Sequence, residues 1–202
     1  MLHLKLYQPF LLEKYKLLFF SIPKVACTSF YYVFIKIFKP NWNFFYDVRL
    51  VHGFIHPTIE IEKIENYNNY VRAGFVRNPF DRLVSMFNSK KDKNFYFINP
   101  NSFKETVENV CKNRITDEHV LPQYNFLYRH DKPLFNFIGR FENIEDDFNR
   151  LLKLTNLPIK KLPKKNVTNA NKLHYRDYYD KRTRKLVEEY YRKDLEVFNY
   201  RF

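Results

Sequence analysis

The chain has 202 residues, of which 45% are hydrophobic and 19% aromatic. This supports one sizeable core and excludes a disordered chain, so we expect a single domain over residues 1–202. The net charge of +13 favours an anionic ligand, two cysteines exclude a disulfide framework, and three glycines are too few for a GxGxxG or GxxxxGK phosphate loop.

The first half of the chain alternates between strand and helix patterns. Residues 16–22 form a dense apolar run and predict a buried strand. Residues 28–38 carry apolar side chains at helical spacing and predict a helix. A short helix is expected over residues 58–64, followed by a second strand over residues 70–76.

The second half continues the same alternation. Pro79 suits the first position of a helix, and Ser102 with Glu105 has capping-box spacing. The remaining expected elements are a helix over 102–111, a strand over 134–141, a helix over 143–154 capped by Asn143, and one long helix over 177–198. The order predicts an α/β fold with a small, mostly parallel sheet flanked by helices.

The N-terminal 23 residues contain no clean apolar stretch. Lys5, Glu13, Lys14 and Lys16 interrupt them, whereas a membrane span needs roughly 20 apolar residues. A signal peptide also needs an uninterrupted apolar segment. We therefore expect a cytoplasmic protein without a transmembrane segment, in at most peripheral contact with an anionic membrane surface.

The sequence SIPKVACTSF, residues 21–30, joins the first strand to the first helix. A helix N-terminus offers N–H groups and partial positive charge to a phosphate. Lys24 adds a full charge, and Thr28 and Ser29 add hydroxyl groups. The alternative is an ordinary strand–helix turn with a surface lysine and a capping threonine.

The sequence FVRNPFDRLVSMF, residues 75–87, repeats this layout. Arg77 lies at a strand end, where open α/β sheets bind ligands, and an arginine can hold a phosphate through two N–H groups. Ser85 follows about two helical turns later. We expect Arg82 to be structural and paired with an acid such as Asp47 or Glu142. Two anion sites predict a ligand with two separated phosphate groups.

These two motifs resemble those of sulfotransferases that use 3′-phosphoadenosine 5′-phosphosulfate (PAPS). IPKVACTSF looks like their 5′-phosphosulfate loop, and RNPFDRLVSMF looks like their 3′-phosphate motif. HVLPQY, FNFIGRFENIEDDFNRLLKL and YYRKDLEVFNY are similar to later blocks of the Golgi chondroitin, HNK-1 and heparan 2-O-sulfotransferases. The resemblance implies a P-loop-like sulfotransferase fold and, without an anchor or stem, a compact bacterial or viral member.

The resemblance assigns the donor-binding residues. It implies that PAPS is the sulfuryl donor and that no metal is needed. The 5′-phosphosulfate would be bound by Lys24, Val25, Ala26, Cys27, Thr28 and Ser29, the 3′-phosphate by Arg77 and Ser85, and the nucleotide would be covered by a loop with Lys164 and Lys165. Cys27 departs from the usual serine, which keeps the backbone contact and loses a hydroxyl contact.

Transfer to an acceptor hydroxyl needs fixed cations and a base of near-neutral pKa. Lys24 is the candidate cation. His52 and His56 lie between the two motifs, and the spacing of His56 fits the catalytic histidine of the heparan 2-O-sulfotransferases better. We expect His56 to be the base, and His52 to be either a structural residue such as a helix cap or the alternative base. His130, beside Asp131, is expected in a surface turn.

The acceptor predicted by the resemblance is a glycan, which the basic charge suggests is acidic or polar. His119 and Gln123, in the HVLPQY block, are candidates to contact it, with core packing as the equal alternative for His119. Residues 160–202 hold 13 Lys/Arg against 6 Asp/Glu and predict either a basic groove or a solvated helix face. Tyr124, Tyr175, Tyr178 and Tyr179 would stack on sugars or simply pack.

Two other classes compete with a sulfotransferase. A nucleotide or sugar kinase would need an acid for Mg²⁺ after a strand, and none stands out. A basic nucleic-acid-binding module would suit the charge, but no zinc-finger, RRM or helix-turn-helix signature is present, so no specific nucleic-acid partner is expected.

Overall fold

The computed structural model describes residues 9–39, 58–113, 115–163 and 173–202. The chain forms two compact units. The sheet unit comprises Met1–Val76 and Phe126–Val167, and the helical unit comprises Arg77–Asn125 and Thr168–Phe202. The assignment of residues 1–202 to a single domain stays a prediction.

The sheet unit contains a four-stranded sheet in the order β1-β2-β3-β6. The strands are β1 (Phe10–Leu12), β2 (Leu17–Phe20), β3 (Val71–Val76) and β6 (Phe137–Arg140). β2, β3 and β6 are parallel, and β1 pairs antiparallel with β2. The predicted α/β fold with a small, mostly parallel sheet is confirmed. β1 was not predicted, because three residues are too few to show an alternating pattern.

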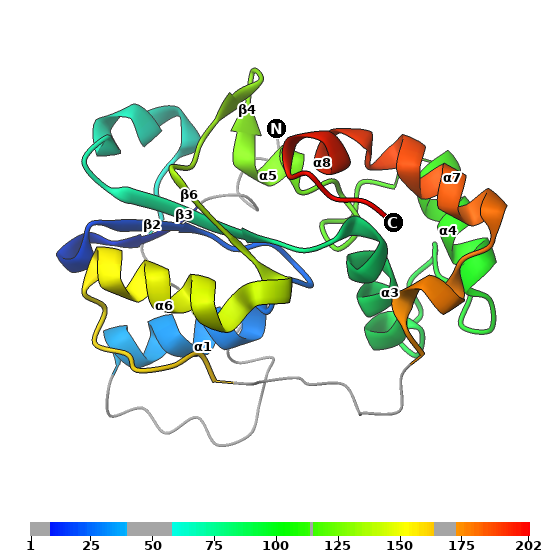
Figure 1. Ribbon diagram of the computed structural model, residues 1–202, viewed down its shortest axis with the longest axis horizontal. Helices are drawn as coiled ribbons and strands as arrows, with labels where there is room; N and C mark the ends of the chain where they lie inside the picture. The colour runs from blue at the N-terminus through cyan, green and yellow to red at the C-terminus, as the bar shows by residue number, and fades with distance from the viewer. Residues whose placement is uncertain (1–8, 40–57, 114, 164–172) are drawn as a thin grey trace. The chain divides into compact units, whose positions relative to one another are not determined.

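Helices α1 (Cys27–Phe38) and α6 (Ile144–Thr155) lie side by side against one face of this sheet (Figure 1). The Phe30 ring of α1 is 4.7 Å from the Phe75 ring and 5.9 Å from the Phe148 ring, centroid to centroid. A Cβ at Gly139 would lie 2.3 Å from the Phe75 ring. The aromatic core therefore depends on a glycine in β6.

The opposite face carries Leu127 of the short helix α5 (Tyr124–Leu127), whose Cδ2 would lie 2.7 Å from a Cβ at Gly74. A hairpin follows, formed by β4 (Tyr128–Arg129) and β5 (Lys132–Pro133). Its turn residues His130 and Asp131 are exposed with φ of 48° and 57°, as a type I′ turn requires. The predicted surface turn at His130 is confirmed. The expected short helix near residue 58 is a 3₁₀ helix, η3 (Ile61–Tyr67).

The helical unit is built from α3 (Pro79–Lys90), α4 (Phe103–Lys112), α7 (Lys181–Tyr190) and α8 (Arg192–Val197). Its core is a cluster of buried side chains that includes Phe80, Val107, Val187 and Tyr191. Pro79 is at the start of α3 and Ser102 caps α4, accepting the Glu105 N–H at 3.2 Å, as predicted. The unit is stabilised by apolar burial at the meeting of these helices.

The single long helix expected over residues 177–198 is wrong. The segment forms a 3₁₀ helix, η5 (Tyr175–Tyr178), and then the separate helices α7 and α8. Asp180 accepts the Thr183 N–H at 2.7 Å, and the Thr183 hydroxyl accepts the Asp180 N–H at 2.9 Å. This capping box starts a new helix at Lys181.

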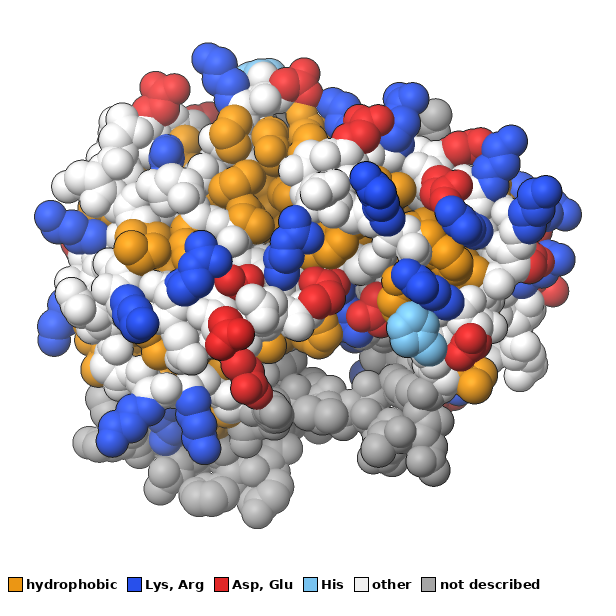
Figure 2. All heavy atoms as spheres, in the orientation of Figure 1, with side chains coloured by type: hydrophobic (Ala, Val, Ile, Leu, Met, Phe, Trp, Pro, Cys, Tyr) orange, Lys and Arg blue, Asp and Glu red, His pale blue; other side chains and the backbone are white. Residues whose placement is uncertain are grey.

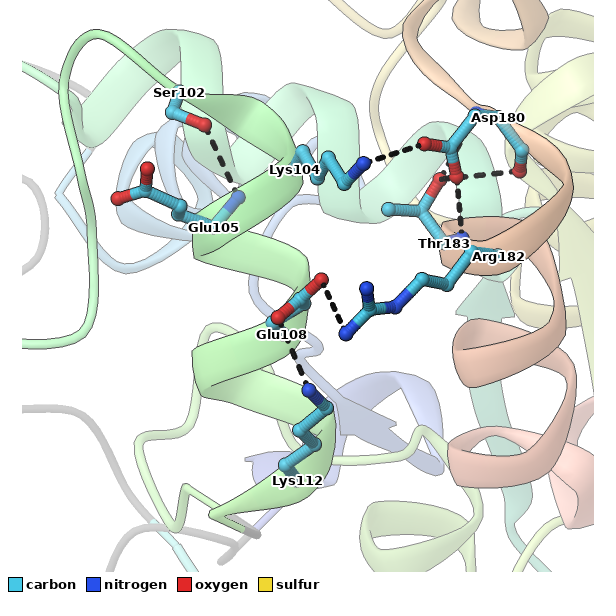
Figure 3. Close-up of polar contacts among 8 residues, drawn as sticks. All are labelled: Ser102, Lys104, Glu105, Glu108, Lys112, Asp180, Arg182 and Thr183. Atoms are coloured by element: carbon cyan, nitrogen blue, oxygen red, sulfur yellow. Dashed lines mark hydrogen bonds and ion pairs between the residues drawn. The ribbon is translucent and has the colours of Figure 1, made fainter.

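Charged side chains join α4 to α7 (Figure 3). Lys104 contacts Asp180 at 3.2 Å, and Glu108 contacts Arg182 at 3.1 Å and Lys112 at 3.0 Å. Exposed ion pairs of this kind contribute little to stability individually. These ion pairs nevertheless connect α4 with α7 and its cap, so part of the basic charge of α7 is neutralised within the helical unit.

We expect Asp180 to make the stability of the protein sensitive to acid. Hydrogen bonds from the Thr183 backbone and hydroxyl, and then Lys104, lower the pKa of Asp180 to about 2. Because the pKa is lower in the folded state, this stabilisation is complete above the unfolded value of about 3.9 and is lost as pH falls toward 2. In urea titrations over this range, the wild-type midpoint should fall more than that of Asp180→Asn, which caps without titrating. Asp177→Asn is the control, and parallel profiles for wild type and Asp180→Asn would contradict the assignment.

Candidate functional site

The loop from β2 to α1 has an unusual backbone. Lys24 and Ala26 adopt left-handed conformations with φ of 69° and 54°. The left-handed conformation costs a non-glycine residue roughly 1–2 kcal/mol. The loop nevertheless contains no glycine. Alternating left-handed residues can turn successive backbone N–H groups toward one anion, and strain of this kind concentrates at functional sites. The backbone of this loop is thus compatible with binding an anion, although it lacks the glycines usual in phosphate-binding loops.

The first turn of α1 follows directly. Cys27 begins the helix and is half-buried, while Thr28 and Ser29 are 8% and 3% exposed. The Ser29 N–H donates to the Ala26 carbonyl at 2.9 Å. No acid lies in this first turn, so the positive end of the helix dipole is not offset there by a carboxylate of α1. The segment is suited to an anion.

Arg77 directly follows the last residue of β3. β2 and β3 are parallel neighbours in the sheet unit, so both strands end at the same edge of the sheet. The Arg77 side chain is 13% exposed, and its Nε donates to Asp81 Oδ2 at 2.8 Å. Asp81, one helical turn later, therefore fixes the direction of the guanidinium. Ser85 is half-buried in the middle of α3.

The start of α3 is fixed by hydrogen bonds around Asn78. Its Oδ1 accepts the Phe80 N–H at 3.0 Å, and its Nδ2 donates to the Arg201 carbonyl at 2.8 Å. The Tyr179 hydroxyl donates to the Phe80 carbonyl at 2.9 Å. These bonds hold the backbone immediately after Arg77.

Arg82 has the structural role expected for it. It is 1% exposed and donates to the carbonyls of Leu121 at 2.7 Å and Glu118 at 3.2 Å. Burial lowers the pKa of its guanidinium, and electrostatic interactions with Tyr191 and Asp194 partly offset this effect. Two backbone carbonyls thus bind the guanidinium, and Asp47, one of its expected partners, lies outside the described residues.

Gln123 has no exposed surface. Its amide is hydrogen-bonded to the backbone of Arg77 and to Asp194, which favours a positioning role over the predicted acceptor contact. Asp194 was missed by the sequence analysis. The sequence did contain a signal for it. Val187, Tyr191 and Asp194 have the spacing of residues on one helix face, and the apolar Val187 and Tyr191 mark that face as buried.

His119 is paired with an acid. Its Nδ1 lies 2.8 Å from Asp117 Oδ1, and the same oxygen accepts the His119 backbone N–H at 2.9 Å. Burial raises the pKa of Asp117, but the His119 hydrogen bonds outweigh it and the net shift is downward. The contact fixes the orientation of a half-buried imidazole, an arrangement that catalytic histidines also use.

Four predicted site residues, His52, His56, Lys164 and Lys165, lie outside the described residues. Within the described ranges, no group of three or more His, Cys, Asp or Glu is arranged to hold a metal ion. In the same part of the chain, none of the helices is long and apolar enough to cross a bilayer.

The C-terminal tyrosines and basic residues mainly contact other residues of the helical unit. The rings of Tyr178 and Tyr179 lie 5.4 Å and 5.0 Å from that of Phe103, centroid to centroid. Lys193 Nζ is 4.4 Å from the Tyr124 ring centroid, and Arg184 contacts Glu188 at 2.7 Å. Basic and acidic side chains are interleaved on the face shown in Figure 2. These contacts favour packing and a solvated helix face over a uniformly basic groove.

Comparison with known proteins defines the class. Residues 8–201 match the model of the sulfotransferase family, so the chain belongs to that family. The resemblance found in the sequence is thereby confirmed at the level of the family.

Individual proteins are also similar to this chain in sequence. Human carbohydrate sulfotransferase 9 is 23% identical over 239 aligned positions, covering 93% of this chain and 52% of that protein. Mouse carbohydrate sulfotransferase 8 is 23% identical and covers 74% of this chain and 43% of its own length. An uncharacterized protein of Archaeoglobus fulgidus is 35% identical over 46% of this chain and 72% of its own. The chain spans about half the length of the human relative. No solved structure matches this chain.

Proposed function

We propose that the protein transfers a sulfuryl group from PAPS to a hydroxyl of a carbohydrate, giving 3′-phosphoadenosine 5′-phosphate (PAP) and an O-sulfated glycan. The observation that carries this proposal is the strained, glycine-free turn at Lys24 and Ala26, which leads into an acid-free helix start. Such a turn is a phosphate-binding device, and membership of the sulfotransferase family supports PAPS as the phosphate-bearing donor.

The turn after β2 binds the 5′-phosphosulfate in this proposal. Backbone N–H groups from Val25 to Cys27 and the hydroxyls of Thr28 and Ser29 hold its oxygens. Lys24 stabilises the negative charge on the sulfuryl oxygens and the departing phosphate, where a fixed cation has its largest effect. The half-buried Cys27 takes part through its backbone.

Arg77 and Ser85 bind the 3′-phosphate, which distinguishes PAPS from other adenine nucleotides. Arg77 is suited to this because Asp81 fixes its guanidinium and a charge-assisted bond to phosphate is among the strongest hydrogen bonds. Lys164 and Lys165 add positive charge to a loop over the nucleotide.

In the transfer step, the acceptor oxygen attacks sulfur while the bond between sulfur and the bridging phosphate oxygen breaks. The electron pair of that bond leaves on PAP, and a base takes the acceptor proton. His56 is the proposed base. The carbohydrate acceptor follows from the printed names of the relatives, and His119, oriented by Asp117, is proposed to contact it.

The proposal is tested by comparing PAP with AMP, which lacks the 3′-phosphate. At about 100 times its Kd, PAP should add about 2.7 kcal/mol to the free energy of unfolding, measured by calorimetry. AMP at the same concentration should add far less, because Arg77 and Ser85 have no phosphate to bind. ATP and a single-stranded oligonucleotide are the controls for a kinase and a nucleic-acid-binding module. Equal stabilisation by PAP and AMP would refute the two-phosphate assignment.

A further inference from the structure

The backbone of Arg77, the residue after β3, is held by a side chain. Val76 pairs with Arg140 in the last register pair of β3 and β6. At the next residue, the Arg77 N–H donates to Gln123 Oε1 at 2.9 Å, and Gln123 Nε2 donates to the Arg77 carbonyl at 2.8 Å. One side-chain amide thus binds both main-chain groups of Arg77, as a neighbouring strand would.

The Gln123 amide is itself held in one orientation. The Gln123 backbone N–H donates to Asp194 Oδ2 at 2.8 Å, and Nε2 lies 3.3 Å from the same oxygen. Asp194 Oδ1 accepts the Tyr124 N–H at 2.8 Å. Because a carboxylate accepts and does not donate, Nε2 must face Asp194 and the Arg77 carbonyl. The carbonyl oxygen of the amide is thereby directed at the Arg77 N–H.

A second anchor ties the same segment to α3. Buried Arg82, on α3, donates to the carbonyls of Glu118 and Leu121, just before Gln123. Asp194 comes from α8 and has no exposed surface. Burial raises the pKa of this carboxyl, although the donors from Tyr124 and Gln123 oppose the effect. All of these residues belong to the helical unit, so these contacts lie within that unit.

We propose that Gln123, held by Asp194, is a positioning residue that fixes the backbone of Arg77 and so makes the protein selective for donors with a 3′-phosphate. This inference rests on the proposed function, in which Arg77 binds that phosphate. The arginine side chain is long, so a small rotation of the Arg77 backbone displaces the guanidinium at its end farther than it displaces the backbone atoms. Backbone bonds to Gln123 and the Nε bond to Asp81 restrict the side chain at both ends.

The test is the Gln123→Met variant, which keeps the length of the side chain and removes both bonds to Arg77. We expect its PAP affinity to fall about tenfold, while its AMP affinity stays unchanged. Combined with Arg77→Ala, Gln123→Met should cause no further loss of PAP affinity, because it acts only through Arg77. Titration calorimetry of the four proteins with PAP and AMP gives the complete cycle.

Asn136 provides a matched control. At the other end of β3, its Oδ1 accepts the Arg72 N–H at 2.8 Å and its Nδ2 donates to the Tyr70 carbonyl at 2.9 Å. Asn136→Leu therefore removes a similar pair of backbone contacts. It should lower the melting temperature without changing the ratio of PAP to AMP affinity.

The outcomes separate the two proposals. Equal PAP and AMP affinity in the wild type refutes the two-phosphate assignment of the proposed function. A wild type that prefers PAP, with the same preference in Gln123→Met or an additive loss in the double variant, overturns the positioning role alone. If Gln123→Met does not fold, Gln123→Glu keeps the acceptor for the Arg77 N–H and loses the donor to the Arg77 carbonyl, so it should also reduce the preference for PAP, and an unchanged preference overturns the positioning role. Amide exchange of the wild type needs no variant: PAP should slow exchange at Arg77 more than AMP does, and equal exchange overturns the inference.

Discussion

The His56→Ala variant is expected to bind PAP normally and to lose turnover by roughly 10²–10⁴-fold, the usual contribution of a positioned general base. Binding should persist because the imidazole is proposed to face the acceptor hydroxyl and not the nucleotide. An imidazole acts as a base only when neutral, so the wild-type rate should fall as the pH is lowered and the ring takes up a proton. Turnover is measured with labelled PAPS and an acceptor found by screening glycans against the wild type.

Two histidine variants serve as controls for His56→Ala. His52→Ala should lose stability or change little, and His130→Ala, in the exposed turn of the β4–β5 hairpin, should keep full turnover. An active His56→Ala beside a folded but inactive His52→Ala would reverse the assignment. If both were active, His119 would be the next candidate base, because Asp117 already orients its ring.

The Arg77→Ala variant is expected to weaken PAP binding by roughly 10- to 150-fold, since a hydrogen bond to a charged group contributes about 1.5–3 kcal/mol. AMP binding should be unchanged. The variant also leaves the Asp81 carboxylate without its Nε contact to Arg77, which adds repulsion toward a phosphate.

Titration calorimetry with PAP and AMP measures the effect of Arg77→Ala, and circular dichroism checks the fold. Arg192→Ala is the matched control, because Arg192 is an exposed arginine of the same unit. Unchanged PAP affinity in a folded Arg77→Ala protein would remove Arg77 from the site.

Local signals in the sequence located most of the regular structure. The apolar run at residues 16–22 contains β2, the pattern at residues 28–38 matches α1 within one residue, and Pro79 starts α3. These predictions succeed because the period of apolar residues and the chemistry of helix starts act over a few residues. The order of strands and helices then gave the class of sheet, since alternation implies parallel neighbours.

The candidate site could be predicted in part. The sequence by itself indicated Lys24 and Arg77 as cations after two strands, and both lie within the residues that match the family model. It did not reveal that Lys24 and Ala26 are left-handed, because in non-glycine residues the rest of the fold must impose that conformation. It also merged the end of η5, α7 and α8 into one helix, because it did not recognise the helix start at Asp180 or the break at Tyr191.

Only the tertiary structure showed what holds Arg77 in place. Gln123 is 46 residues from Arg77 in sequence, and Asp194 is 71 residues from Gln123. Hydrogen bonds between residues so far apart leave no local pattern, because they form only after α3, α8 and the segment before α5 have come together. The sequence by itself determined which residues could bind an anion, and the packing of the helical unit decided how the arginine among them is held.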